Sequence, residues 1–395
     1  MNSNNIKLGE LFIERGDSIN PKNYPDETFE LYSIPSYDNQ IPEILLGSAI
    51  GSTKKCLEEY DVLLSKIVPH IRRCWIVGTN SGYRQIGSSE WITFRSEKFD
   101  PDYLRYFLLS DDFNKKYLGT IKGVGGSLMR ADPKQVAQFN IPLPPLETQK
   151  QIAAILKKAE MIRQNDKIII DKYDQLAQSV FNEMFGNEQG NNMTLDEVSD
   201  KSSKGTFSNG PFGSDLLTSE LTTSGVPVIY IRDIRHGEFN WVSNVFVTKE
   251  KANNLQNCQV IPGDLLIAKV GDPPGIAAIY PKNRGLAIIT QDVIRFRSNP
   301  NITNSEYLKF WFNSHIGQYH LNPIIVDGTR KRFGLGDLKK TKIMVPHINL
   351  QNRFTNIITH LEYQKNLSHR SLLKSDMLFR SLIQRAFNGE LLFGT

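Results

Sequence analysis

The chain has 395 residues, and at roughly 100–200 residues per domain this length predicts two or three domains. With 39% hydrophobic and 23% charged residues and a mean hydropathy of −0.35, the composition excludes a fibrous or wholly disordered protein. The net charge of +5 is a mild bias that does not by itself establish a nucleic-acid partner.

Membrane insertion and secretion are not expected. No apolar run approaches the ~20 residues that cross a bilayer, and the first five residues lack the charged and apolar stretches of a secretory signal. Cys56, Cys74 and Cys258 are too few and too scattered for a disulfide framework or a zinc site. We therefore expect a cytoplasmic protein with reduced thiols.

Residues 1–143 predict a compact domain of mixed α and β structure. The segment is rich in Gly, Pro, Asn and Ser, which favour turns between short elements. One helical stretch is expected at Tyr103–Leu109.

Residues 144–190 predict one long helix, from about Glu147 to Phe185. Pro144 and Pro145 cannot lie inside it, and Gly186 suits the position after its end. At 1.5 Å per residue the helix would be about 58 Å long. Its apolar residues follow a heptad spacing interrupted once at Asp166, which favours a coiled-coil seam. The seam residues are Ile152, Ile155, Ala159, Ile162, Ile169, Tyr173, Leu176 and Val180.

The remaining chain follows the same plan. Residues 191–345 predict a second mixed domain, with β-type runs at Val226–Arg232 and Val260–Val270 and a helical stretch at Tyr307–Phe312. Residues 346–395 predict a second long helix from Asn349, a favourable N-cap residue, to Phe387. Polar residues interrupt the centre of its apolar stripe.

The second half repeats the first at an offset of 202 residues. Ile141–Gln149 lines up with Ile343–Gln351, and the same offset pairs Glu160 with Glu362. Three further segment pairs match upstream with small shifts: Asp61–Ile67 with Asp264–Val270, Trp91–Ser96 with Val293–Ser298, and Tyr103–Phe107 with Tyr307–Trp311. Four collinear matches are too many for chance, so the chain is an internal duplication.

The duplication predicts the fold class. We expect an α+β protein with two mixed domains separated by two long antiparallel coiled-coil helices, related by a pseudo-two-fold axis. The alternative is that each helix only covers its own domain. A length of about 58 Å exceeds what a domain of this size needs, and this favours packing of the helices against each other.

Catalytic and metal-binding motifs are not found. None of the seven histidines falls in an H-E-x-x-H pattern, and the glycines of Gly123–Gly126 lack the Gly-Lys-Ser/Thr ending of a phosphate-binding loop. Asp272-Pro273-Pro274 resembles the Asp-Pro-Pro-Tyr signature of amino-methyltransferases. Gly275 replaces the aromatic residue, however, so we interpret this fragment as a loop after a strand.

Several motifs resemble one family, the specificity subunits of Type I restriction-modification systems. Pro142–Ile152 is similar to the opening of their central conserved helix, and Ala386–Leu391 to the end of their distal one. Ser208–Ser214, continued by Gly225–Ile229, resembles the start of a target-recognition domain, and Gly263–Lys269 a recurrent strand. The first domain begins instead with Leu31–Asp38, which resembles another recognition-domain subtype. The two halves are therefore expected to recognise different sequences.

The resemblance implies a non-catalytic subunit that recognises a bipartite, asymmetric target in double-stranded DNA, one half per domain. It also implies two methyltransferase subunits and motor-nuclease subunits as partners. The chain itself would hold no cofactor, and S-adenosylmethionine, ATP and Mg are expected on the partner subunits. The alternative is a duplicated coiled-coil scaffold for protein interactions without DNA specificity.

Two basic loops are candidates for DNA contact, because each precedes the strand that leads into its long helix. Sequence recognition needs side chains that reach base edges and cations that bind phosphates. The alternative is a solvated surface loop. The candidate residues are Lys122, Ser127 and Arg130 in the first loop and Thr329, Arg330, Lys331 and Arg332 in the second. Arg72, Arg73, Lys54 and Lys55 are weaker candidates.

The long helices are the expected assembly surface. Apolar residues beyond a two-helix seam would be free to contact partner helices. The predicted partner-binding residues are Ile152, Leu156, Ile168, Phe181, Ile358, Leu361 and Phe379.

Overall fold

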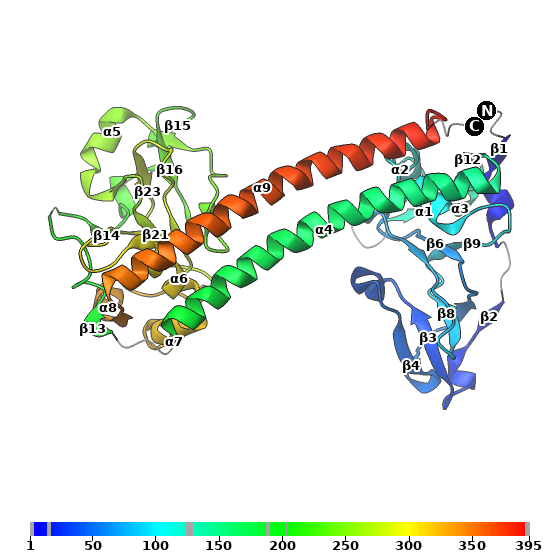
Figure 1. Cartoon of the computed structure of the whole chain (residues 1–395), viewed down its shortest axis with the longest axis horizontal. Coiled ribbons are helices and arrows are strands. Elements are labelled where there is room, and N and C mark those ends of the chain that lie inside the picture. Colours follow the sequence, from blue (N-terminus) through cyan, green and yellow to red (C-terminus); the bar gives the residue numbers. More distant parts are fainter. Residues whose placement is uncertain (1–3, 14–16, 124–128, 187–189, 203, 392–395) are drawn as a thin grey trace. The chain divides into compact units, whose positions relative to one another are not determined.

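The computed structural model describes residues 4–13, 17–123, 129–186, 190–202 and 204–391 (Figure 1). The chain forms two compact units. Unit 1 comprises Met1–Ile168 and Ser368–Thr395, and unit 2 comprises Ile169–Leu367. Each unit contains one globular domain and part of two long helices, α4 (Leu146–Phe185) and α9 (Ile348–Phe387).

The domain of unit 1 contains a five-stranded sheet in the order β2-β5-β8-β3-β4 and a three-stranded sheet in the order β7-β6-β9. In the larger sheet β3 and β8 are parallel, and the other neighbours are antiparallel. The strands are β1 (Asn4–Lys7), β2 (Ser18–Ile19), β3 (Thr28–Tyr32), β4 (Glu43–Leu46), β5 (Lys54–Cys56), β6 (Val62–Ser65), β7 (Cys74–Ile76), β8 (Arg84–Gly87), β9 (Trp91–Phe94), β10 (Ile121–Lys122), β11 (Arg130–Ala131) and β12 (Asn140–Leu143), and the helices are α1 (Pro101–Leu109), α2 (Asp111–Leu118) and α3 (Pro133–Val136).

The domain of unit 2 is built in the same way, with sheets in the orders β15-β19-β16-β23-β20 and β14-β24-β21-β22. Here β16 and β23 form the parallel pair. The strands are β13 (Asn191–Thr194), β14 (Phe207–Asn209), β15 (Leu221–Thr222), β16 (Val226–Ile229), β17 (Ile234–Arg235), β18 (Glu238–Phe239), β19 (Phe246–Val247), β20 (Gln259–Val260), β21 (Leu265–Ala268), β22 (Ala277–Ile279), β23 (Ala287–Ile289), β24 (Val293–Phe296) and β25 (Lys342–Val345), and the helices are α5 (Lys249–Asn254), α6 (Ser305–Asn313), α7 (His315–Leu321) and α8 (Leu335–Lys340).

The duplication extends to individual hydrogen bonds. In unit 1 the buried amide of Gln149 donates to the carbonyl oxygens of Pro144 at 2.8 Å and Lys98 at 3.0 Å. In unit 2 the amide of Gln351, at the 202-residue offset, donates to Pro346 at 2.7 Å and Ile302 at 3.1 Å. Each bond pairs the side-chain amide with a backbone carbonyl in a segment that precedes a helix. The predicted internal duplication is confirmed.

The long helices agree with the sequence prediction to within one residue at each end. The expected N-cap role of Asn349 is wrong, because α9 already begins at Ile348. The side chain of His347 supplies the cap instead: its Nδ1 accepts a hydrogen bond from the backbone N–H of Asn349 at 3.2 Å. A side-chain acceptor just before a helix satisfies an otherwise unpaired amide.

Within each unit the two long helices run antiparallel and contact each other. Arg163 of α4 pairs with Asp376 of α9 at 3.6 Å in unit 1, and Asp174 of α4 pairs with Lys365 of α9 at 2.7 Å in unit 2. These pairs exchange at the 202-residue offset. Unit 1 also buries a hydrogen bond of 2.7 Å from the Ser375 hydroxyl to the Asp166 carboxylate. The alternative that each helix only covers its own domain is therefore wrong.

Both domains pack onto both helices through a short amphipathic helix. In unit 1, Arg105 of α1 forms an ion pair with Glu160 of α4 at an N···O distance of 3.0 Å. The ring of Tyr106, also on α1, packs edge-on against the ring of Phe379 of α9, with 6.1 Å between the ring centroids. In unit 2, α6 presents Lys309 to Glu362 of α9 at 3.1 Å. Burial of apolar side chains in these contacts stabilises the packing of each domain on the long helices.

Candidate nucleic-acid interface

The second basic loop is a short turn closed by backbone pairing. Val326 and Arg332 exchange hydrogen bonds, with N···O distances of 2.7 and 3.2 Å. The loop is fastened to the end of β21, where the Gly271 N–H donates to the carbonyl of Lys331 at 3.1 Å and Val270 forms a bridge with Arg332. Thr329, Arg330, Lys331 and Arg332 are all exposed. The predicted residues therefore lie together on one fixed turn.

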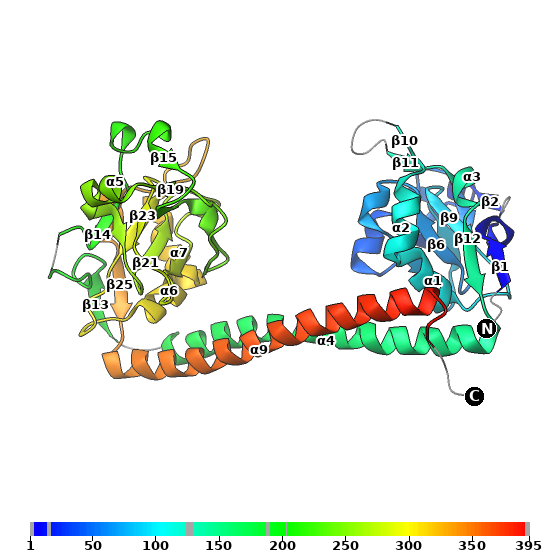
Figure 2. The same cartoon turned by 90° about the horizontal axis from the view of Figure 1, so that it is seen from above.

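The first basic loop is fastened in the same way. The Val68 N–H donates to the carbonyl of Met129 at 3.1 Å, and Ile67 forms a bridge with Arg130. In Figure 2, β10 and β11 lie on the side of their domain away from α4 and α9. Ser127 lies outside the described residues. The two loops thus hold equivalent places in the duplicated domains, as the sequence predicted, and Met129 corresponds to Lys331.

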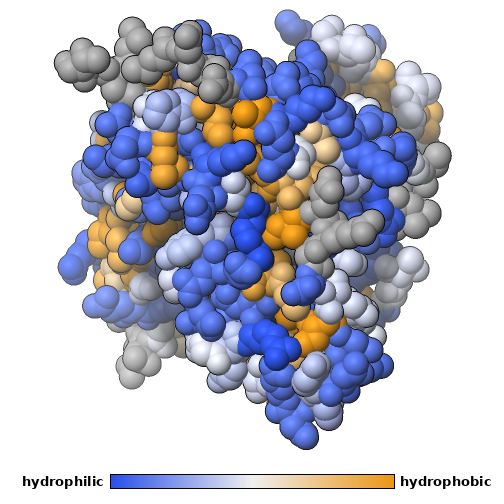
Figure 3. Space-filling model, turned by 90° about the vertical axis from the view of Figure 1, so that its right-hand side faces the viewer, coloured by the Kyte–Doolittle hydropathy of each residue, from blue (hydrophilic) through white to orange (hydrophobic). Residues whose placement is uncertain are grey.

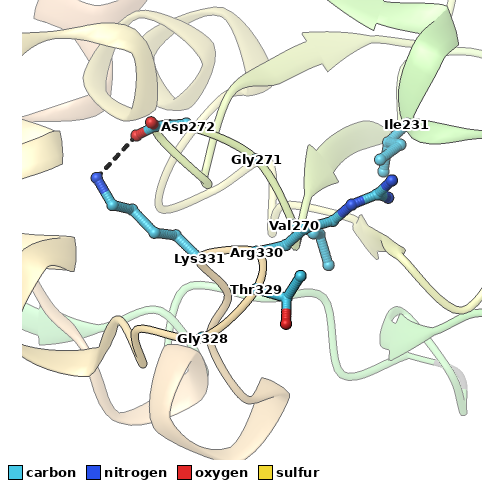
Figure 4. A pocket seen from close by; sticks show the side chains of 8 residues that line it. All are labelled: Ile231, Val270, Gly271, Asp272, Gly328, Thr329, Arg330 and Lys331. Atoms are coloured by element: carbon cyan, nitrogen blue, oxygen red, sulfur yellow. Dashed lines mark hydrogen bonds and ion pairs between the residues drawn. The ribbon is translucent and has the colours of Figure 1, made fainter.

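A pocket of about 440 Å³ adjoins the second loop. It lies between the turn, the segment after β21 and the start of a short helix, and is lined by Ile231, Val270, Gly271, Asp272, Gly328, Thr329, Arg330 and Lys331. Figure 4 shows Lys331 directed towards Asp272 and Arg330 directed away from it, towards Ile231. The pocket thus has a basic wall and an acidic one.

The cations of the loops differ in what they contact. Lys122 is bound to Asp132 at 2.5 Å, Arg130 to Glu90 at 3.2 Å, and Lys331 to Asp272 at 2.9 Å. The hydrogen bond that Lys122 donates to Asp132 lowers the pKa of Asp132, and the hydrogen bond that Lys331 donates to Asp272 raises the pKa of Lys331.

By contrast, the guanidinium groups of Arg330 and Arg332 have no hydrogen-bond or ion-pair partner among the residues that the structure describes. They are therefore available to an external anion such as a phosphate.

The weaker candidates are held by the protein itself. Arg72 pairs with Asp111 at 2.5 Å and Arg73 with Asp38 at 3.3 Å. Lys55 donates to the carbonyl of Trp91 at 2.8 Å, and Lys54 to Ser52 at 2.5 Å. Desolvation lowers the pKa of both lysines. These contacts account for the four side chains without a ligand.

Two features near the second loop were missed by sequence reasoning. One is the Asp272 carboxylate facing Lys331, a contact across 59 positions of the chain. The other is the exposed ring of Phe212, over which the Lys269 ammonium lies at 5.6 Å. Phe212 belongs to the Gly-Pro-Phe-Gly segment, so the motif itself was the available signal.

The predicted partner-binding residues of the helices require a correction. Five of them are buried inside this chain, with at most 7% of their surface exposed: Ile152, Leu156, Phe181, Ile358 and Phe379. Leu361 packs partly buried against the core of unit 2. The prediction that they are free for partners is wrong for these residues, because α1 and α6 cover that face of the helices. Ile168 is 49% exposed and remains available.

Part of the predicted seam lies at the surface instead. Ile162, Ile169 and Leu176 of α4 recur every seven residues and are 51%, 41% and 46% exposed. Helix α9 adds a comparable set of exposed apolar side chains: Ile357, Tyr363, Leu367, Leu373, Met377 and Leu378. Figure 3 shows, on one face of the molecule, apolar patches among mostly hydrophilic side chains. Contiguous exposed apolar patches are typical of interaction surfaces.

Among the residues described, no three His, Cys, Asp or Glu side chains are grouped to hold a metal ion. No helix in the described ranges is long and apolar enough to cross a membrane.

Comparison with known proteins identifies the family. The family model of the Type I restriction modification DNA specificity domain matches residues 2–175 and again 187–374. The MjaVIII specificity subunit of Methanocaldococcus jannaschii is 25% identical over 305 residues, which cover 69% of this chain and 68% of that protein.

Solved structures share the fold. A chain from a structure concerned with complex assembly and conformational transition of the type I R-M system matches with a TM-score of 0.63 and 19% identity, covering 98% of both chains. The Type-I restriction-modification S subunit from M. genitalium matches with a TM-score of 0.54 and 13% identity, covering 97% of this chain and 96% of that one. Because the family model covers both halves of the sequence, the chain belongs to the family of non-catalytic DNA specificity subunits of Type I restriction-modification systems.

Proposed function

We propose that this chain recognises a bipartite, asymmetric site in double-stranded DNA, with one domain for each half-site. The observation that carries the proposal is the pair of equivalent loops with different side chains. Equivalent backbone hydrogen bonds hold the two loops at equivalent places in their domains. The first loop nevertheless has Met129 where the second has Lys331. A constant scaffold that displays variable residues is suited to two different base sequences.

Two guanidinium groups that have no partner within the described ranges, those of Arg330 and Arg332, supply the affinity. Arg330 and Arg332 are exposed on a turn that its own backbone bonds hold in place, so little loop entropy is lost when an anion binds. An arginine can donate two parallel hydrogen bonds to a phosphate or to the O6 and N7 atoms of guanine. The first contact fixes the register of the protein on DNA, and the second selects a base.

The exposed apolar residues of α4 and α9 are the proposed docking surface for two methyltransferase subunits. Motor-nuclease subunits would complete the complex. In this proposal the partner subunits bind S-adenosylmethionine, ATP and Mg, and this chain selects the DNA sequence.

A salt titration tests the DNA-binding role. The affinity of the full chain for duplex DNA is measured from low to moderate salt, together with the variants R330A and R330A/R332A. If both arginines bind phosphates, the slope of log affinity against log salt should become shallower by about 0.9 per contact. The matched control is R72A, because Arg72 is already paired with Asp111.

The scaffold alternative predicts the opposite result in this titration. A duplicated interaction scaffold without DNA specificity would bind all duplexes equally and weakly, and the arginine variants would leave the slope unchanged.

A further inference from the structure

The Asp272–Lys331 pair has the donor and acceptor spacing of a base-pair edge. The Lys331 ammonium and the Asp272 carboxylate lie 2.9 Å apart, and their side chains are 46% and 79% exposed. Both line the pocket beside Arg330 (Figure 4). A carboxylate beside a basic loop repels phosphate and lowers affinity for DNA in general, a cost that a contact with a base would offset.

The two residues differ together between the duplicated domains. The backbone bond from Gly271 to Lys331 corresponds to the one from Val68 to Met129. In this register Lys331 corresponds to Met129, and Asp272, which follows Gly271, corresponds to Pro69. The first domain thus carries neither charge at these two positions, whereas Arg332 of the second loop is matched by Arg130 of the first. The cation shared by both loops is the bridging arginine, and the acid–lysine pair is specific to the second.

The major-groove edge of a G·C pair is complementary to this arrangement. Guanine O6 accepts and cytosine N4 donates, and the two atoms are hydrogen-bonded to each other. Their separation is therefore close to the usual N–H···O distance of about 2.9 Å. An ammonium and a carboxylate at the same spacing can meet both atoms, the lysine at guanine O6 or N7 and the aspartate at cytosine N4.

Resting on the proposed DNA-recognition function, we propose that Asp272 and Lys331 together recognise one G·C base pair in the half-site of the second domain. Their mutual ion pair orders both side chains before DNA arrives. On the cognate base pair each exchanges part of this contact for one with a base. On a C·G or A·T pair the Asp272 carboxylate faces guanine O6 or thymine O4, and the repulsion between acceptors adds to the selectivity. A T·A pair offers the same order of acceptor and donor, O4 and N6, and differs from G·C in that the thymine methyl group replaces guanine N7.

The test uses the full chain and a duplex pool with a randomised region. The sequence selected by the wild type is first determined, and every single base-pair change in it is then measured by competition. We expect D272A and K331M each to lose about tenfold or more discrimination at the same G·C position, which lies in one half-site only. K331M introduces the residue type that the first loop carries, and D272N supplies a variant of the same shape.

The matched controls are K201A and D196A, which break another exposed ion pair of the same domain, 2.7 Å long. They should leave every preference unchanged. If D272A, D272N and K331M keep the wild-type preference at all positions, or if K331M weakens all sequences equally, the inference is overturned and the proposed function stands. A wild-type chain that selects no sequence would overturn the proposed function itself.

Discussion

The exposed and buried apolar residues of the long helices should respond to substitution in opposite ways. Leu156 is fully buried in the core of unit 1, and Ile162, less than two turns away on the same helix, is 51% exposed. Truncating a buried leucine to alanine removes contacts and leaves a cavity, at a cost of about 2–5 kcal/mol. For a unit of this size, at about 2–4 °C per kcal/mol, L156A should lower the melting temperature by roughly 4–20 °C.

A charge at the exposed position should leave stability nearly unchanged and impair partner binding. I162E changes a solvent-facing residue and should alter stability by about 0.5 kcal/mol or less. It should nevertheless abolish co-purification with a methyltransferase subunit, because a buried unpaired carboxylate is costly at an apolar interface. Q164E, a new charge on an exposed polar residue of α4, is the control and should bind normally.

Thermal unfolding and affinity co-purification of L156A, I162E and Q164E test both expectations. An I162E chain that forms the complex normally would refute the assignment of this surface. A fully stable L156A chain would refute the account of the core.

Further perturbations have equally defined outcomes. A four-residue insertion near Gly186, which lengthens α4 by about 6 Å, should change the preferred spacer between half-sites and leave both half-sites unchanged, as genome-wide methylation mapping would show. Burial raises the pKa of Glu160, but its contacts with Arg105 and Tyr106 outweigh this, so that its pKa lies below the ordinary 4.5. This carboxylate therefore stabilises unit 1 above pH 4.5, and the stabilisation is lost as the pH falls through the lowered pKa. Acid unfolding of E160Q should accordingly depend less on pH than that of the wild type.

The sequence predicted the features that depend on the chain alone. The duplication, the two long helices and the equivalence of the basic loops follow from repeated segments, and prolines and glycines mark helix boundaries. The structure places Arg130 and Arg332 in equivalent bridges, to Ile67 just after β6 and to Val270 just after β21, as the repeat implies.

The helix faces could not be predicted because apolar residues occur on more than one of them. Ile162, Ile169 and Leu176 follow a heptad and predict a seam, yet they lie at the surface. Leu156 and Phe181 depart from it and are buried. The outcome is set by α1 and α6, which pack onto each helix from the domains, and a single-helix pattern carries no information about such neighbours.

The basic residues of the candidate site could be predicted from the sequence, but the contact with Asp272 could not. The run Arg330-Lys331-Arg332 is visible as a basic segment, whereas its contact with Asp272 joins residues 59 positions apart. Only the fold brings the end of β21 against the turn. The same is true of the difference between Arg330, which is unpaired among the described residues, and Lys122, which Asp132 binds.

A domain exchange tests the central claim most directly. Residues 191–345 are replaced by the corresponding domain of another family member, and methylated adenines are mapped across the genome of cells that carry the complex. Modular recognition predicts a new second half-site, with the first half-site and the spacer retained. A change in both half-sites would contradict it and would mean that the two domains form one continuous recognition surface.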